Sequence, residues 1–164
     1  MLRSLALLNA ANDPAAWQNF YIMIGTANAA ITGLLFVALS MHLGPILKHA
    51  VFKPRAIVVL VVLTTQIIIS AIVLTPQPEV VMGWEILVLN LAFLAINFRQ
   101  RGELRLDRGL ALTLAIRITY LYAAITLIVG IGGGFYVLGA ILVITIARSM
   151  SNCWTLLTAV ESAS

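Results

Sequence analysis

The chain has 164 residues, of which 62% are hydrophobic and only 10% are charged. A soluble domain carries about 25% charged residues, so this composition excludes a globular protein that covers its whole surface in water. The net charge of +4 comes from too few basic residues to indicate a nucleic-acid partner, and the single cysteine excludes an intramolecular disulfide.

Long apolar runs separated by short polar segments predict an all-α integral membrane protein, because a transmembrane helix needs about 20 apolar residues. The first helix is expected over residues 14–43, with Asp13 as its N-cap and Pro14 in the first helical position. The opening sequence MLRSLALLNAANDP is expected to form an interfacial or loosely packed leader rather than a cleavable signal. Four further helices are expected over residues 54–74, 80–98, 109–129 and 135–160.

Prolines and glycines mark the ends of these helices. Two prolines in the segment Thr75–Pro78 forbid continuation of the second helix. The sequence GIGGG, Gly130–Gly134, is expected to be a tight connection, and the alternative is that it folds back and makes one apolar run re-entrant. The loops are too short for an extramembrane domain. Residues 1–164 are therefore expected to form one transmembrane domain, a five-helix bundle whose partners are membrane lipids and other transmembrane helices.

Loop charges predict the orientation of the bundle. The second and fourth loops carry no Lys or Arg, whereas the first and third loops are basic, with Lys48, Lys53, Arg55, Arg99, Arg101, Arg105 and Arg108. Basic loops face the cytoplasm, so the N-terminus is expected outside and the C-terminus in the cytoplasm. An interfacial belt agrees, with Trp17, Tyr21, Trp84, Phe135 and Tyr136 near the outer face and Trp154 near the inner face. This pattern and the compact loops favour a bacterial inner membrane.

The first helix carries a ridge of small residues, Gly25, Ala29 and Gly33, spaced four apart. Such a ridge lets another helix approach closely, and Asn28 lies on the same side. The ridge is interpreted either as a packing surface within one chain or as an interface between chains. The opposite side, with Leu34, Leu35 and Val37, is expected to face lipid.

Each helix also carries one polar stripe with a period of about 3.6 residues. Polar groups that face hydrocarbon would lack hydrogen-bond partners, so these stripes are expected to face one another or a partner protein. The stripes of the second to fifth helices contain Gln66 and Ser70; Asn90 and Asn97; Thr113, Arg117 and Tyr120; and Thr145, Arg148, Asn152 and Thr155.

Arg117 and Arg148 lie at membrane depth and are the main candidate site residues. At a rise of 1.5 Å per residue, Arg117 lies about 12 Å from the cytoplasmic end of its helix and Arg148 about 20 Å from the external end of its helix. Three interpretations remain open: an anion-attracting site, side chains that extend to the cytoplasmic headgroups, or donors to Asn90, Asn97 or helix-end carbonyls. Glu85 is too far along the membrane normal to pair with either arginine and is expected near the outer headgroups or an aqueous vestibule.

The sequence contains no recognisable catalytic set. Paired intramembrane carboxylates, a nucleophile with its base and a metal-ligand motif are all missing, so neither an enzyme nor a cofactor nor a metal site is expected. His42 and His49 lack acidic or cysteine neighbours, and Cys153 is expected to be a packed residue or an acylation site. The favoured function is a non-catalytic membrane subunit or scaffold in a larger or self-associated assembly. The alternative is an oligomeric channel or transporter, with an anion as the favoured solute, lined by Arg117, Arg148, Asn90, Asn97 and Asn152.

Overall fold

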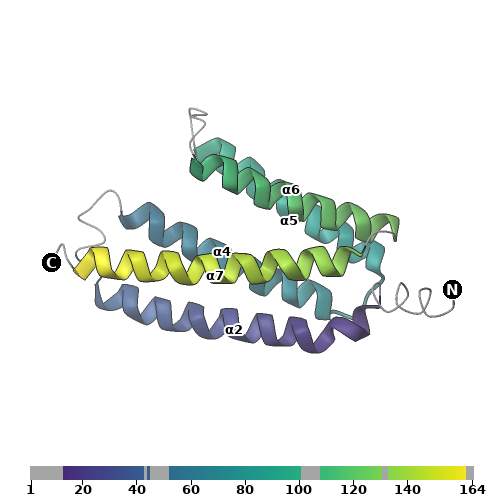
Figure 1. The fold of residues 1–164 in the computed structure, drawn as a ribbon, viewed down its shortest axis with the longest axis horizontal. Helices are drawn as coiled ribbons and strands as arrows, with labels where there is room; N and C mark the ends of the chain where they lie inside the picture. The colour runs from purple at the N-terminus through teal and green to yellow at the C-terminus, as the bar shows by residue number, and fades with distance from the viewer. Residues whose placement is uncertain (1–12, 43, 45–51, 101–107, 131–132, 162–164) are drawn as a thin grey trace. The chain divides into compact units, whose positions relative to one another are not determined.

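The computed structural model describes residues 13–42, 44, 52–100, 108–130 and 133–161, and within them the chain forms five helices (Figure 1). They are α2 (Pro14–Met41), α4 (Phe52–Leu74), α5 (Glu79–Gln100), α6 (Arg108–Val129) and α7 (Gly134–Glu161). The five predicted helices are confirmed, with ends that differ by no more than two residues. Four of them, α2, α4, α6 and α7, are long and apolar enough to cross a membrane.

Local hydrogen bonds explain where the helices begin and end. Asp13 caps α2, because its Oδ1 accepts a hydrogen bond of 3.0 Å from the backbone N–H of Ala15, which confirms the predicted cap. Gly130 ends α6 with a positive φ of 74°, and its N–H donates to the carbonyl of Thr126 at 2.9 Å. The apolar runs on either side of the glycine segment are unbroken helices, which argues against the re-entrant alternative.

The helices are divided between two compact units. The first unit comprises the described parts of residues 1–19 and 72–141, and the second those of residues 20–71 and 142–164. The first unit therefore contains α5, α6 and the starts of α2 and α7, whereas the second contains most of α2, α4 and α7. The single transmembrane domain over residues 1–164 stays a prediction.

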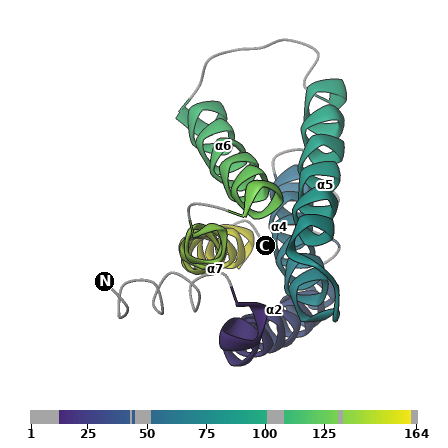
Figure 2. The same ribbon diagram turned by 90° about the vertical axis from the view of Figure 1, so that its right-hand side faces the viewer.

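In the first unit, α5 and α6 pack along one another, and Figure 2 shows them close together at the start of α5 and farther apart toward its end. Gly83 makes the close approach possible. A Cβ at this position would lie 2.9 Å from the backbone oxygen of Ala124 and 2.7 Å from Cγ1 of Ile128. The two backbones therefore meet at a distance that only glycine allows.

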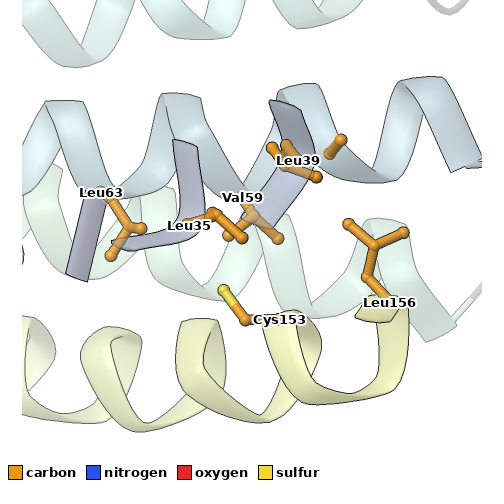
Figure 3. Close-up of a cluster of buried hydrophobic side chains, with 7 residues drawn as sticks. Leu35, Leu39, Val59, Leu63, Cys153 and Leu156 are labelled. Carbon is orange, nitrogen blue, oxygen red and sulfur yellow. The ribbon is translucent and has the colours of Figure 1, made fainter. Parts of the chain in front are cut away.

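In the second unit, α2, α4 and α7 enclose an apolar cluster (Figure 3). Leu35 was expected to face lipid, and this prediction is wrong, because its side chain is buried in this cluster. The reason is that Leu35 lies seven residues after Asn28, so the two side chains share the buried stripe of α2. The apolar cluster consists of Leu35, Leu39, Ala56, Val59, Leu63, Cys153 and Leu156.

Candidate functional site

Arg117 contacts α5 within the first unit. The amide nitrogen of Asn90 donates to the backbone oxygen of Arg117 at 3.1 Å, and Nη1 of Arg117 donates back to Oδ1 of Asn90 at 3.4 Å. The guanidinium carbon lies 5.0 Å from the ring centroid of Phe93. These contacts support the third interpretation of Arg117, in which the side chain is a donor to another helix of the same chain.

The free energy that these contacts contribute is comparable to the cost of placing arginine at this depth. Arginine in the middle of a transmembrane helix costs about 2.5–3.5 kcal/mol on insertion scales. A hydrogen bond to a charged group contributes about 1.5–3 kcal/mol, and the 3.4 Å separation puts this one at the weak end. A desolvated cation–π contact contributes about 2 kcal/mol. Together, Asn90 and Phe93 can offset the cost of Arg117 without an external anion.

Glu85 is exposed and does not lie beside an arginine in the described structure. Its Oε2 accepts a hydrogen bond of 2.8 Å from Nε2 of Gln77, which also donates to the backbone oxygen of Ile72 at 3.2 Å. Gln77 thus links the end of α4 to the first turns of α5. Nearby, partial burial raises the pKa of Glu79, the first residue of α5, and the negative charge of Asp13 raises it further.

The second unit contains a group of buried polar side chains that we call the polar layer: Asn28, Gln66, Ser70 and Thr145. All four are at least 97% buried. Gln66 donates from Nε2 to Oγ1 of Thr145 at 2.8 Å, and Thr145 donates to the backbone oxygen of Leu142 at 3.0 Å. Asn28 donates from Nδ2 to the backbone oxygen of Ile24 at 2.9 Å. The polar layer therefore joins all three helices of this unit.

Several buried atoms in this unit lack a hydrogen-bond partner among the described residues. They are Oδ1 of Asn28, Oε1 of Gln66, Oγ of Ser70 and Nη1 of Arg148. Most buried polar side-chain atoms in proteins are hydrogen-bonded, and each exception costs about 1–3 kcal/mol. Such a concentration in one three-helix unit identifies this region as the strongest candidate site in the described chain.

Arg148 differs from Arg117 in its surroundings. Its side chain is half-buried, and the burial of Nη1 argues against an arrangement in which the whole guanidinium lies among headgroups. Helical side chains tilt toward the N-terminus of their helix, so the stem of Arg148 starts toward Thr145. Asn152, the next member of the predicted stripe, is exposed.

The predicted site residues are therefore distributed over both units. Arg117, Asn90 and Glu85 belong to the first unit, whereas Arg148 and Asn152 belong to the second. The side chain of Asn97 lies outside the described residues. Sequence reasoning placed Gln66, Ser70 and Thr145 on polar stripes but not in the site. The four-residue spacing of Gln66 and Ser70 was the available signal, because it puts both on one face of a helix.

The small-residue ridge of α2 turns away from the packing of its own chain. A Cβ at Gly25 would lie 3.1 Å from Cβ of Ser70, whereas a Cβ at Gly33 would meet no described atom within 4 Å. Ala29 and Gly33 are both exposed. Each four-residue step advances about 40° around a helix, so the ridge rotates away from the buried stripe that Tyr21, Ile24 and Asn28 begin.

The aromatic residues divide into buried and exposed groups. Tyr21 and Phe135 are fully buried, so their expected place in the interfacial belt is wrong, because both lie on the packed sides of their helices. Trp17 stacks on Phe135 with ring centroids 6.3 Å apart and meets Tyr136 edge-on at 4.6 Å. The exposed side chains that remain available for a belt include Trp84, Tyr136 and Trp154.

No group of three His, Cys, Asp or Glu side chains in the described parts of the chain could hold a metal ion. His42 donates or accepts through Nδ1 at 2.9 Å from the backbone oxygen of Ala38, and His49 lies outside the described residues. Cys153 is packed in the apolar cluster, as the first of its two interpretations predicts. No protein-family model, curated protein or solved structure matches this chain.

Proposed function

We propose that this protein is a non-catalytic, multi-pass membrane subunit that assembles with a second copy of itself through α2, with α5 as its fifth span. The observation that carries the proposal is the small-residue face of α2, defined as Thr26, Ala29, Ala30 and Gly33. All four residues are exposed, and α2 packs within its own chain through the opposite side. Small residues on an exposed transmembrane face allow another helix backbone to approach closely.

A second copy is the occupant that suits this face best. In a two-fold symmetric dimer the same surface is used by both chains, so small residues lie opposite small residues. The closest approach of two helices then occurs where neither carries a bulky side chain. Around this face, exposed apolar side chains such as Leu34 and Val37 suit lipid tails. We therefore propose membrane lipid as the partner of these surrounding side chains.

The proposed location is a bacterial inner membrane. The proposed orientation follows from the loop charges, with the N-terminus outside and the C-terminus in the cytoplasm. Lys48, Arg101 and Arg105 carry much of this argument and lie outside the described residues. An impermeant thiol reagent applied outside intact cells tests it on a Cys153→Ala chain with one new cysteine at Arg101. We expect no labelling until the membrane is opened, and labelling of intact cells would overturn the orientation.

Oxidative cross-linking in native membranes tests the assembly. In a Cys153→Ala background, Gly33→Cys puts a thiol on the small-residue face, and Leu34→Cys puts one beside it on an exposed position outside that face. We expect a disulfide-linked dimer from Gly33→Cys and little or none from Leu34→Cys. Equal cross-linking at both positions would indicate random collision. A cross-link of Gly33→Cys to a different protein would replace the second copy with a larger complex.

Solute transport is the second candidate function, and the buried, unpartnered Nη1 of Arg148 favours it. Arg117 is the matched control, because Asn90 and Phe93 already hold its guanidinium. In proteoliposomes, an anion pathway predicts a flux that falls by about tenfold or more in Arg148→Gln and is largely retained in Arg117→Gln. Absence of anion flux in the unmodified protein would remove this candidate.

A further inference from the structure

We propose that the polar layer of the second unit binds water within the membrane span, as a site for a small neutral molecule that donates two hydrogen bonds. This inference goes beyond the proposed assembly and does not depend on it, because the polar layer lies on the buried side of α2. Three features of the unit support the proposal: the common level of the four side chains, the orientation of their amides and the charge of Arg148.

Contacts between the helices bring the four side chains to one level of the unit. Gly25 lies against Ser70, and Gln66 is hydrogen-bonded to Thr145. The apolar cluster pairs later residues of α2 with earlier residues of α4, so these two helices are antiparallel. At 1.5 Å per residue, Asn28 lies about 4.5 Å beyond Gly25 along α2. Because α4 runs the other way, the same direction leads along α4 from Ser70 to Gln66. The polar layer therefore spans little more than one helical turn.

The hydrogen bonds within the layer fix which atoms remain available. The amide nitrogen of Asn28 donates to a backbone carbonyl, which can only accept, so Oδ1 cannot take its place. Thr145 uses its hydroxyl proton on Leu142 and therefore accepts from Gln66, which leaves Oε1 of Gln66 free. Two amide oxygens and the hydroxyl of Ser70 thus remain without partners among the described residues.

These atoms select a neutral hydrogen-bond donor. An anion would meet two amide oxygens that carry partial negative charge. A cation would meet Arg148, which cannot lose its proton and lies about one helical turn from Thr145 along α7. Water donates two hydrogen bonds and accepts others, and a buried water in a protein makes about three. In the proposed site, water donates to the amide oxygens of Asn28 and Gln66 and accepts from the hydroxyl of Ser70.

Leu63 provides a matched position for the test. Both Leu63 and Ser70 lie on α4, and both are buried, with exposed fractions of 0% for Leu63 and 1% for Ser70. Leu63 belongs to the apolar cluster, whereas Ser70 belongs to the polar layer. A difference in the reactivity of cysteines at these two sites therefore reports the polarity of their surroundings rather than their burial.

The experiment measures thiol modification in native membranes. Single cysteines at Ser70 and Leu63, each in a Cys153→Ala background, are treated with methyl methanethiosulfonate, a small neutral reagent, and followed by mass spectrometry. Only a thiolate reacts, and a thiolate needs a hydrated surrounding. We expect Ser70→Cys to react at least about tenfold faster than Leu63→Cys. Equal rates would overturn the proposal.

A second pair of variants separates hydration from misfolding. Adding Gln66→Leu to the Ser70→Cys chain removes one amide oxygen, and we expect the rate to fall toward that of Leu63→Cys. If Ser70→Cys does not accumulate in the membrane, Asn28→Cys takes its place with the same expectation. A rate that Gln66→Leu leaves unchanged would show that the reagent reaches the site by unfolding, and this outcome would also overturn the proposal.

Discussion

At the scale of single residues, the two intramembrane arginines differ in their surroundings. Arg117 interacts with Asn90 and Phe93 of α5, so its charge is compensated within one unit. Arg148 keeps a buried nitrogen without a partner among the described residues. We therefore assign Arg117 to the stability of the α5–α6 pair and keep Arg148 as a candidate for interaction with a solute.

This assignment predicts a strong coupling between Asn90 and Arg117. Asn90→Leu should lower the free energy of unfolding by about 1.5–3 kcal/mol, because it removes the hydrogen bond to the guanidinium and leaves its contact with Phe93. The double variant Asn90→Leu with Arg117→Leu should regain most of this loss, since replacing both partners by apolar groups is nearly neutral. Denaturation of the four proteins in mixed micelles checks the cycle. Additive effects would show that the two residues act independently.

At the scale of helices, glycines define where backbones approach. A Cβ added at Gly83 would clash with the backbone oxygen of Ala124, whereas a Cβ added at Gly33 would meet open space. The same substitution should therefore have opposite effects at the two positions. This contrast separates a glycine needed for packing within the chain from one that the chain itself leaves uncovered.

Gly83→Ala should destabilise the protein by about 1–3 kcal/mol, because the added methyl group overpacks the α5–α6 contact. Gly33→Ala should instead stabilise an isolated chain by up to about 1 kcal/mol through the helix propensity of alanine. Unfolding in detergent, at a protein concentration low enough to keep chains apart, checks both signs. A neutral Gly83→Ala would mean that α5 and α6 pack less closely than the structure describes.

The sequence predicted the five helices well because their determinants are local. Apolar length, the Asp13 cap, the prolines after Leu74 and the glycine at position 130 act within a few residues of each boundary. The direction of each helix face was harder to predict. The Gly25 ridge looked like one surface, yet only its first member packs closely in the chain, because a four-residue repeat rotates relative to the buried stripe.

Candidate contacts between helices were predictable only in part. The idea that polar stripes face one another is confirmed for Asn90 with Arg117 and for Gln66 with Thr145. Asn152 is exposed in the chain, so for this residue the other half of the idea, that the stripe faces a partner protein, stays a prediction. Composition and spacing name the polar residues of a helix, but they do not say which other helix lies beside it. That choice depends on the packing of whole helices, such as the close approach at Gly83.

At the scale of the whole molecule, the protein combines long apolar helices with an exposed small-residue face on α2. A chain that functions as a subunit should not be isolated alone. The face is short, so the association should depend on close backbone contact and should be sensitive to a single bulky residue. Gly33→Leu introduces such a residue, and Leu34→Ala, at the neighbouring exposed position, is its control.

The most direct measurement of this central claim is the mass of the protein after purification in mild detergent, corrected for bound detergent. We predict twice the chain mass of 17.7 kDa for the unmodified protein and for Leu34→Ala, and the mass of one chain for Gly33→Leu. A single-chain mass for the unmodified protein, or a dimer that Gly33→Leu leaves intact, would contradict assembly through α2.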